Sequence, residues 1–153
     1  MIRLTIDRCA EPQVSQLAML KQYASVPDSS RDALLKLLLT RAMKTVQEAA
    51  DKSLLPSTLT LTVTEREDNA AIRLYQTPDT IESVKDGKGE AIDYVRKGNS
   101  LLPRSFTETV VVTYTTRPDP AQADSLFAVV LQYATALYDG ASSEELAQIL
   151  SQC

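Results

Sequence analysis

Histidine is missing from the 153 residues, and cysteine occurs only twice, near the two ends. Without histidine, Ser-His-Asp and Cys-His nucleophile systems cannot form, and the commonest general base is absent. Cys9 and Cys153 have neither CxxC spacing nor a histidine partner, which argues against a zinc site. We therefore expect a chain that is not an enzyme, with no catalytic residue, metal or cofactor. We favour reduced cysteines over a terminal disulfide in a cytoplasmic protein and assign them no role.

Long hydrophobic runs are also missing. The apolar stretch at residues 33–39 is interrupted by Lys36, and no apolar stretch approaches the roughly 20 residues of a membrane span. The opening segment, MIRLTIDRCAEP, has no apolar core of signal-peptide length and no small-residue cleavage site. We expect no membrane partner and synthesis in the cytoplasm.

Two charged turns are candidate ligand sites. Glu65, Glu67 and Asp68 lie in one turn, where alternate side chains point apart and no second acidic cluster completes a metal site, so a solvated turn is favoured. The DGKG segment at 86–89 is too short for a phosphate loop and predicts a hairpin turn between two strands. Basic residues near it alternate with acidic ones, and aromatics are scarce, which disfavours sequence-specific nucleic-acid binding.

Charge is unevenly distributed along the chain. Residues 1–56 hold eight basic and six acidic side chains, and residues 57–117 hold eight and nine, whereas residues 118–153 hold five acidic and no basic ones. A purely anionic segment cannot grip a phosphate backbone, because that requires Lys and Arg. It suits either a basic partner or the lining of a passage to which DNA must not adhere.

Length and periodicity predict one α+β domain over 1–153. Apolar residues at helical spacing predict helices at about 12–25, 31–52, 121–139 and 142–151. Asp28-Ser29-Ser30 and Ser142 are the N-cap candidates of the second and fourth helices, and Gly140 is expected to end the third. Alternation predicts a small, mostly antiparallel β-meander within about 57–117, with its strongest strand at 107–116. The helical N- and C-terminal segments are expected to pack together around it.

The order of these elements resembles the head–tail connector, or adaptor, family of tailed bacteriophages. The resemblance covers roughly residues 14–140. It rests on the segments LKQYASVPDSSRDALLKLLLTRAMKTV, IRLYQTPDTIESVKDGKGEAIDYV, TVVVTYTTRP and LFAVVLQYATALYDG. They match, respectively, the family's first two helices, its proline with an I-x-S-V strand and DG turn, its V-x-V-x-Y-T strand, and its closing helix.

The resemblance implies a structural virion protein at the head–tail interface, present as a ring, usually of twelve copies, beneath the portal vertex. The implied partners are other copies of the chain, the portal protein and a stopper or tail-completion protein. The ring would extend the DNA channel, so that genomic DNA passes near it without specific contact. The alternative is a small cytoplasmic protein-binding adaptor or regulatory module.

Two groups of residues are candidate contacts. A short capped helix near one end of the chain is a natural docking element, so we expect it to contact the portal. Loops on a rigid sheet commonly carry contacts, so we expect the two charged turns to face the lumen or the next ring. The portal candidates are Glu144, Glu145, Leu146, Ile149 and Leu150, and the lumen or next-ring candidates are Glu65, Glu67, Asp68, Lys85 and Lys88.

Overall fold

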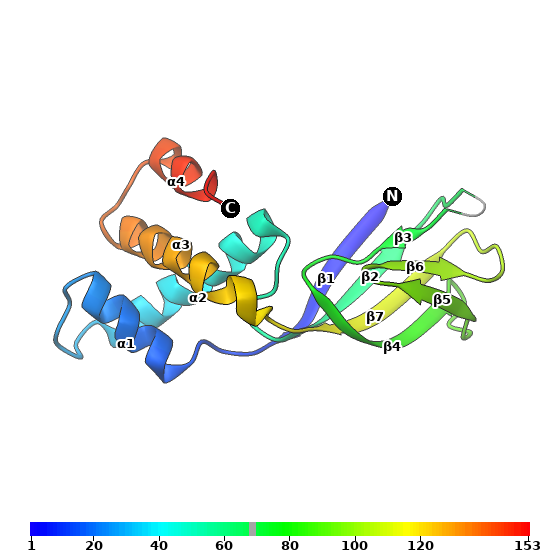
Figure 1. Ribbon diagram of the computed structural model, residues 1–153, viewed down its shortest axis with the longest axis horizontal. Coiled ribbons are helices and arrows are strands. Elements are labelled where there is room, and N and C mark those ends of the chain that lie inside the picture. The colour runs from blue at the N-terminus through cyan, green and yellow to red at the C-terminus, as the bar shows by residue number, and fades with distance from the viewer. Residues whose placement is uncertain (68–69) are drawn as a thin grey trace. The chain divides into compact units, whose positions relative to one another are not determined.

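The computed structural model describes residues 1–67 and 70–153 (Figure 1). The chain forms two compact units, each built from separate stretches of sequence. The β unit comprises Met1–Cys9 and Pro56–Arg117, and the helical unit comprises Ala10–Leu55 and Pro118–Cys153. Whether both behave as the one expected domain stays a prediction. None of the helices within the described residues has the length and apolar character that crossing a membrane requires.

The β unit contains two antiparallel sheets. A four-stranded sheet has the order β1-β2-β7-β4, and a three-stranded sheet has the order β3-β6-β5. The strands are β1 (Ile2–Cys9), β2 (Ser57–Val63), β3 (Ile72–Arg73), β4 (Pro78–Asp86), β5 (Tyr94–Lys97), β6 (Ser100–Pro103) and β7 (Val110–Thr116).

Alternation along β2 and β7 places apolar and polar residues on opposite faces of the four-stranded sheet. On β2, Leu59 and Leu61 are fully buried, while the threonines between them are half-buried. The inner face shares one hydrophobic core with Ile72 of β3, Leu74 just after β3 and Leu101 of β6. The two sheets therefore enclose the core of this unit, and threonines cover the outer face.

The helical unit contains α1 (Val14–Tyr23), α2 (Asp32–Ala50), α3 (Pro120–Tyr138) and α4 (Ser143–Leu150). Leu35, Leu39 and Met43 form one fully buried stripe of α2, as their spacing predicts. Helix α3 packs along α2 and contributes buried residues such as Val130. These contacts form the core of the helical unit.

A buried glutamine fixes the segment that follows α2. The Gln47 side chain is 1% exposed, and its Oε1 accepts hydrogen bonds from the backbone N–H groups of Leu54 (2.7 Å) and Leu55 (3.0 Å). The helix ends at Asp51, which is left-handed with φ 52°. The side chain thus replaces the helix as the partner of two buried backbone donors.

The α+β class is confirmed, with four helices and seven strands among the residues that the structure describes. The predicted β-region begins at about residue 57, whereas Ile2–Cys9 also form a strand, β1, which pairs with β2. The meander is divided between two sheets, because β7 pairs with β2 and β4 rather than with its chain neighbours.

The predicted helix ends were partly right. The Asp28-Ser29-Ser30 cap is wrong, because Asp28 accepts from Ser30 within a turn and the N-cap residue of α2 is Arg31, which has no side-chain cap. Gly140 ends α3 as expected, with φ 74° and a hydrogen bond from Ala141 N to Ala136 O of 2.9 Å.

Candidate interaction surfaces

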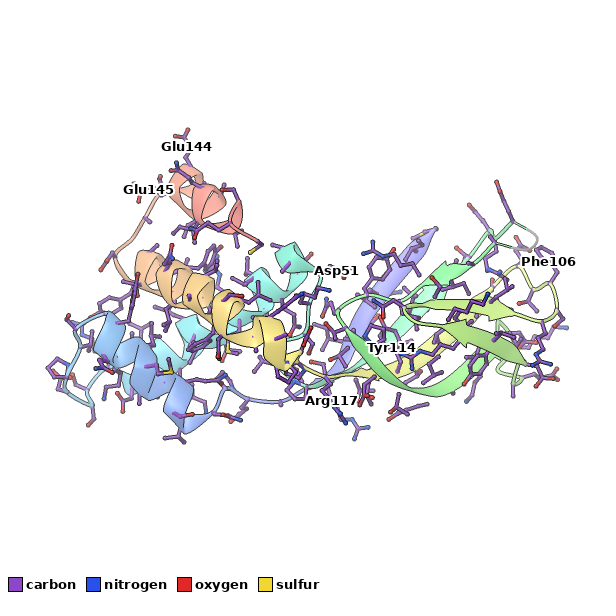
Figure 2. The ribbon with its side chains drawn as sticks, viewed as in Figure 1. Asp51, Phe106, Tyr114, Arg117, Glu144 and Glu145 are labelled. Carbon is purple, nitrogen blue, oxygen red and sulfur yellow. The ribbon has the colours of Figure 1, made fainter. Side chains whose placement is uncertain are left out.

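Helix α4 carries all five portal candidates. Ser142 Oγ accepts a hydrogen bond from Glu145 N at 3.3 Å and caps the helix, which confirms the predicted N-cap. Glu144 and Glu145 lie in the first turn, where negative charge is favoured by the helix dipole, and both are exposed. Figure 2 shows Glu144 projecting from α4 away from α3.

The apolar residues of α4 share one side of the helix. Leu146, Ile149 and Leu150 have i, i+3, i+4 spacing, and each is half-buried. The helix contacts α3, and Gln152 Nε2 donates to Gln132 Oε1 at 2.9 Å, yet α4 has no fully buried residue. It is therefore a short helix with acidic residues at its start and an incompletely covered apolar side.

The structure brings the two predicted lumen loops to one end of the four-stranded sheet. Val63 at the end of β2 and Asp86 at the end of β4 both pair with Val110, the first residue of β7. A Cβ built on Gly87 would lie 3.3 Å from Thr109 Cβ, so the hairpin tip touches the approach to β7. We call this end of the sheet the loop end (Figure 1).

The described lumen candidates are all exposed. They are Glu65, Glu67, Lys85 and Lys88. Asp68 lies outside the described residues. The exposed set thus has two acidic and two basic members, so the described part of the loop end is of mixed charge.

The DGKG segment forms the predicted hairpin turn. Asp86 Oδ1 accepts hydrogen bonds from Lys88 N (2.8 Å) and Glu90 N (3.0 Å), and Gly89 has φ 87°. The hydrogen bond from the Glu90 backbone is the main cause that lowers the pKa of the Asp86 carboxyl below its usual value. The Asp86 side chain therefore closes the turn, which agrees with a structural role for this residue.

Phe106 is a loop-end residue that the sequence reading missed. Its side chain is 55% exposed, and it lies on the loop that enters β7 (Figure 2). Arg66 anchors this loop by donating from its guanidinium to Thr107 O (3.1 Å) and Ala70 O (2.6 Å). A lone aromatic residue in the polar segment RSFTET is the one signal that could have identified it.

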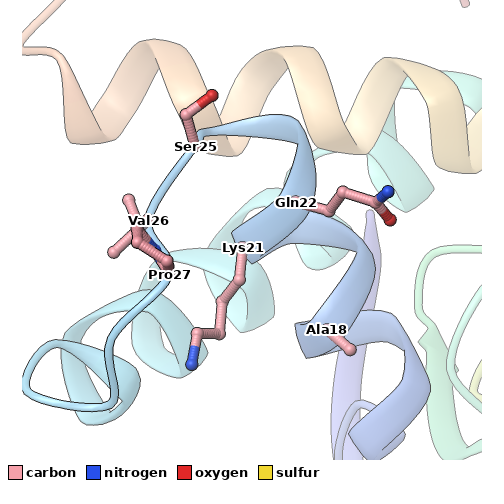
Figure 3. Close-up of a pocket in the computed structure, with 6 residues that line it drawn as sticks. All are labelled: Ala18, Lys21, Gln22, Ser25, Val26 and Pro27. Carbon is pink, nitrogen blue, oxygen red and sulfur yellow. The ribbon is translucent and has the colours of Figure 1, made fainter.

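An open hollow of about 470 Å³ lies beside the end of α1 (Figure 3). Lys21 is the one cation among the residues that line it, and its Nζ is engaged by Asp32 Oδ1 at 2.8 Å. Because that charge is already paired, the hollow fits an apolar side chain better than an anionic ligand. The lining residues are Ala18, Lys21, Gln22, Ser25, Val26 and Pro27.

The grouping of acidic and cysteine side chains and the state of the two cysteines bear on metal and thiol chemistry. Across 1–67 and 70–153, no three His, Cys, Asp or Glu side chains are grouped as metal ligands would be. Cys9 and Cys153 are not in a disulfide, and burial raises the pKa of the Cys153 thiol. A raised pKa leaves less of the reactive thiolate at neutral pH.

No family sequence model matches the chain. No curated protein matches it in sequence. Solved structures do match in fold. A chain in "Virion of native gene transfer agent (GTA) particle" has a TM-score of 0.65 at 15% identity, over 97% of this chain and 93% of that one.

Two further matches come from particle necks. A chain in "Neck of empty GTA particle computed with C6 symmetry" has a TM-score of 0.64 at 14% identity, over 98% of this chain and 94% of the other. A chain in "Neck of native GTA particle computed with C12 symmetry" has a TM-score of 0.57 at 16% identity, over 95% and 93%. This chain shares their fold.

Proposed function

We propose that this protein is a structural component of the neck of a phage-like particle, in the virion, where it forms a ring between the portal and the tail. The observation that carries the proposal is the likeness in fold to a virion chain over 97% of this chain. The similar neck structures were computed with six-fold and twelve-fold symmetry, which supports a ring of copies.

Exposed apolar residues on the helical unit support association between copies. Val14 on α1 is 87% exposed, and Leu34 and Leu37 on α2 are 43% and 67% exposed. A heterologous contact, in which one surface meets a different surface of the next copy, closes into a ring when its rotation permits. Burying these side chains in such a contact would recover hydrophobic free energy that the isolated chain forgoes.

We assign α4 to the portal and the loop end to the lumen or the next ring. Helix α4 offers Leu146, Ile149 and Leu150 beside the exposed Glu144 and Glu145, a pairing that suits a groove with a basic rim. The loop end offers charged turns on a rigid sheet, with exposed Phe106 among them. A stopper or tail-completion protein is the partner expected at the next ring.

The charge distribution supports a channel through which DNA passes without adhering. The five acidic and no basic residues of 118–153 cannot displace counterions from DNA. In this proposal the chain extends the channel and performs no catalysis, in keeping with a sequence that lacks histidine.

Native mass spectrometry tests the proposal directly. The purified protein is measured alone and after mixing with the portal ring of the same particle. We expect a discrete complex with a fixed multiple of this chain per portal ring, which also supplies the stoichiometry. A chain that never joins the portal at near-physiological salt would contradict the proposal and favour a cytoplasmic adaptor with another partner.

A further inference from the structure

Strand β1 leaves one edge of the four-stranded sheet open. It is eight residues long and pairs on one side only, with β2. Ile2 and Ile6 are 57% and 42% exposed, although they face the same side of the sheet as Leu4, which packs on the core. A long edge strand with exposed apolar residues is a ready template for a further strand.

The register shows which backbone groups face that open edge. Met1 N donates to Thr64 O (3.0 Å) and Thr64 N to Met1 O (2.9 Å), so these residues exchange both hydrogen bonds. In an antiparallel pair such residues alternate with non-bonded ones, so Arg3 and Thr5 also bond to β2. The N–H and C=O groups of Ile2, Leu4 and Ile6 therefore point away from β2.

The opposite edge of the same sheet is covered at both of its ends. The Arg96 guanidinium donates to Pro78 O (3.1 Å) and to Asp79 O (2.5 Å) at the start of β4. At the other end of β4, Val84 O accepts from Ile92 N (2.9 Å) within the hairpin. Among the described residues, no comparable hydrogen bond reaches the outward backbone groups of Ile2, Leu4 and Ile6.

We propose that β1 pairs antiparallel with β1 of a second copy of this chain, about a two-fold axis at Leu4. In this register Leu4 is opposite Leu4 of the second copy, and Ile2 is opposite Ile6. Those are the residues whose N–H and C=O groups face the open edge, so each opposed pair exchanges two hydrogen bonds. All three pairs lie before the β-bulge that shifts the register between Ile6 and Arg8.

The apolar face of the joined sheet is self-complementary in this register. On this face, Ile2, Leu4 and Ile6 of the two copies meet one another. On the polar face, Arg3 is opposite Thr5 and equally diagonal to Asp7 and to Arg3 of the second copy. Asp7 lies on that face, because its carboxylate accepts from Thr60 Oγ1. The register therefore rests on the backbone hydrogen bonds and the apolar pairs, and the charged side chains do not select it.

This pairing goes beyond the proposed function, because it concerns the free protein and requires neither portal nor ring. Its test is the mass of the full-length protein over a range of concentrations, by light scattering and native mass spectrometry. We expect a monomer–dimer equilibrium. The double variant Ile2→Lys, Ile6→Lys places lysines opposite each other across the axis, and we expect its dimer dissociation constant to rise at least about tenfold.

The matched control is Val95→Lys, Leu102→Lys. These residues form an exposed cross-strand pair on the other sheet, 41% and 42% exposed, so the control adds the same charge to similar positions. We expect its dimerisation to match the unmodified protein. A monomer at every concentration, or a dimer affected equally by both variants, would overturn the proposal.

Amide hydrogen exchange supplies a second readout that needs no substitution. The amides of Leu4 and Ile6 should become protected as concentration rises, whereas those of Arg3 and Thr5, already bonded to β2, should be protected throughout. A dimer in which Leu4 and Ile6 exchange at the same rate as in the monomer would place the contact elsewhere and also overturn the proposal.

Discussion

At the residue scale, the Tyr114 hydroxyl fixes the backbone just before two left-handed residues of the β unit. Tyr114 is fully buried, and its hydroxyl accepts from Tyr75 N and donates to Tyr75 O, both at 3.1 Å. The next two residues, Gln76 and Thr77, have φ of 62° and 54°, a region that residues other than glycine seldom adopt. We expect Tyr114→Phe to lower the free energy of unfolding by about 1–3 kcal/mol, because two backbone groups lose their partner.

The measurement is urea unfolding followed by circular dichroism, with Tyr133→Phe as the control. Tyr133 is 6% exposed on α3, and its hydroxyl forms no hydrogen bond with any described residue. The same loss of one oxygen should therefore change stability little there. Equal effects of the two variants would show that the Tyr75 contact contributes nothing of its own.

The sequence could predict that Tyr114 is in a strand, since it lies in the alternating run TETVVVTYTT. It could not predict the partner of the hydroxyl, which is 39 residues away in the chain. Nor could it predict left-handed backbone at Gln76 and Thr77, because such strain is imposed by surrounding contacts and leaves no residue signature. Phe106 was missed for a related reason: a single exposed aromatic residue breaks no periodic pattern.

At the element scale, the end of α2 is a place where the sequence works against the fold. Asp51 is left-handed with φ 52°, a conformation that glycine adopts more easily, and an acidic group at a helix C-terminus opposes the helix dipole. We expect Asp51→Gly to have a free energy of unfolding about 1 kcal/mol higher than Asp51→Ala, measured by urea unfolding. Both variants remove the carboxylate, and only the alanine keeps a Cβ in the left-handed conformation. A glycine variant no more stable than the alanine one would refute the backbone explanation.

Helix α4 allows its proposed docking role to be separated from folding. Because none of its residues is fully buried, we expect Glu144→Lys, Glu145→Lys to keep the far-ultraviolet circular dichroism spectrum while reducing capture by the portal ring at least about tenfold. The control, Glu48→Lys with Asp124→Lys, makes the same charge change at two other exposed acidic positions of the helical unit. Portal capture that survives the α4 variant, or truncation after Gly140, would remove α4 from the interface.

Helices were predictable from sequence to within a few residues, because an amphipathic stripe is a local pattern. Sheet organisation was not, because β1 pairs with β2 between residues 48 to 61 positions apart and β7 lies between β2 and β4. The alternation of Ile2, Leu4 and Ile6 was visible, yet a strand without a chain-adjacent hairpin partner gives a weak signal. The joint position of the two charged turns at the loop end likewise follows from pairing with Val110 and from nothing local.

At the scale of the whole molecule, the net charge of −4 belongs to one unit. The β unit holds ten basic and ten acidic side chains, whereas the helical unit holds six and ten, a difference of −4. Every basic residue of the helical unit comes before residue 56, so residues 118–153 contribute acidic groups alone. A partner or a DNA strand approaching the two units therefore meets a balanced surface on one and an anionic surface on the other.

This partition predicts that the protein does not bind duplex DNA. We expect no binding of a fluorescent duplex, by anisotropy, even at low ionic strength, because the anionic unit repels phosphates and the β unit has as many acidic as basic side chains. Replacing Asp139, Glu144 and Glu145 with Lys changes the net charge by +6, from −4 to +2, and should create weak binding that salt abolishes. Salt-dependent binding by the unmodified protein would contradict a non-adhesive channel lining and place an unrecognised basic surface on the β unit.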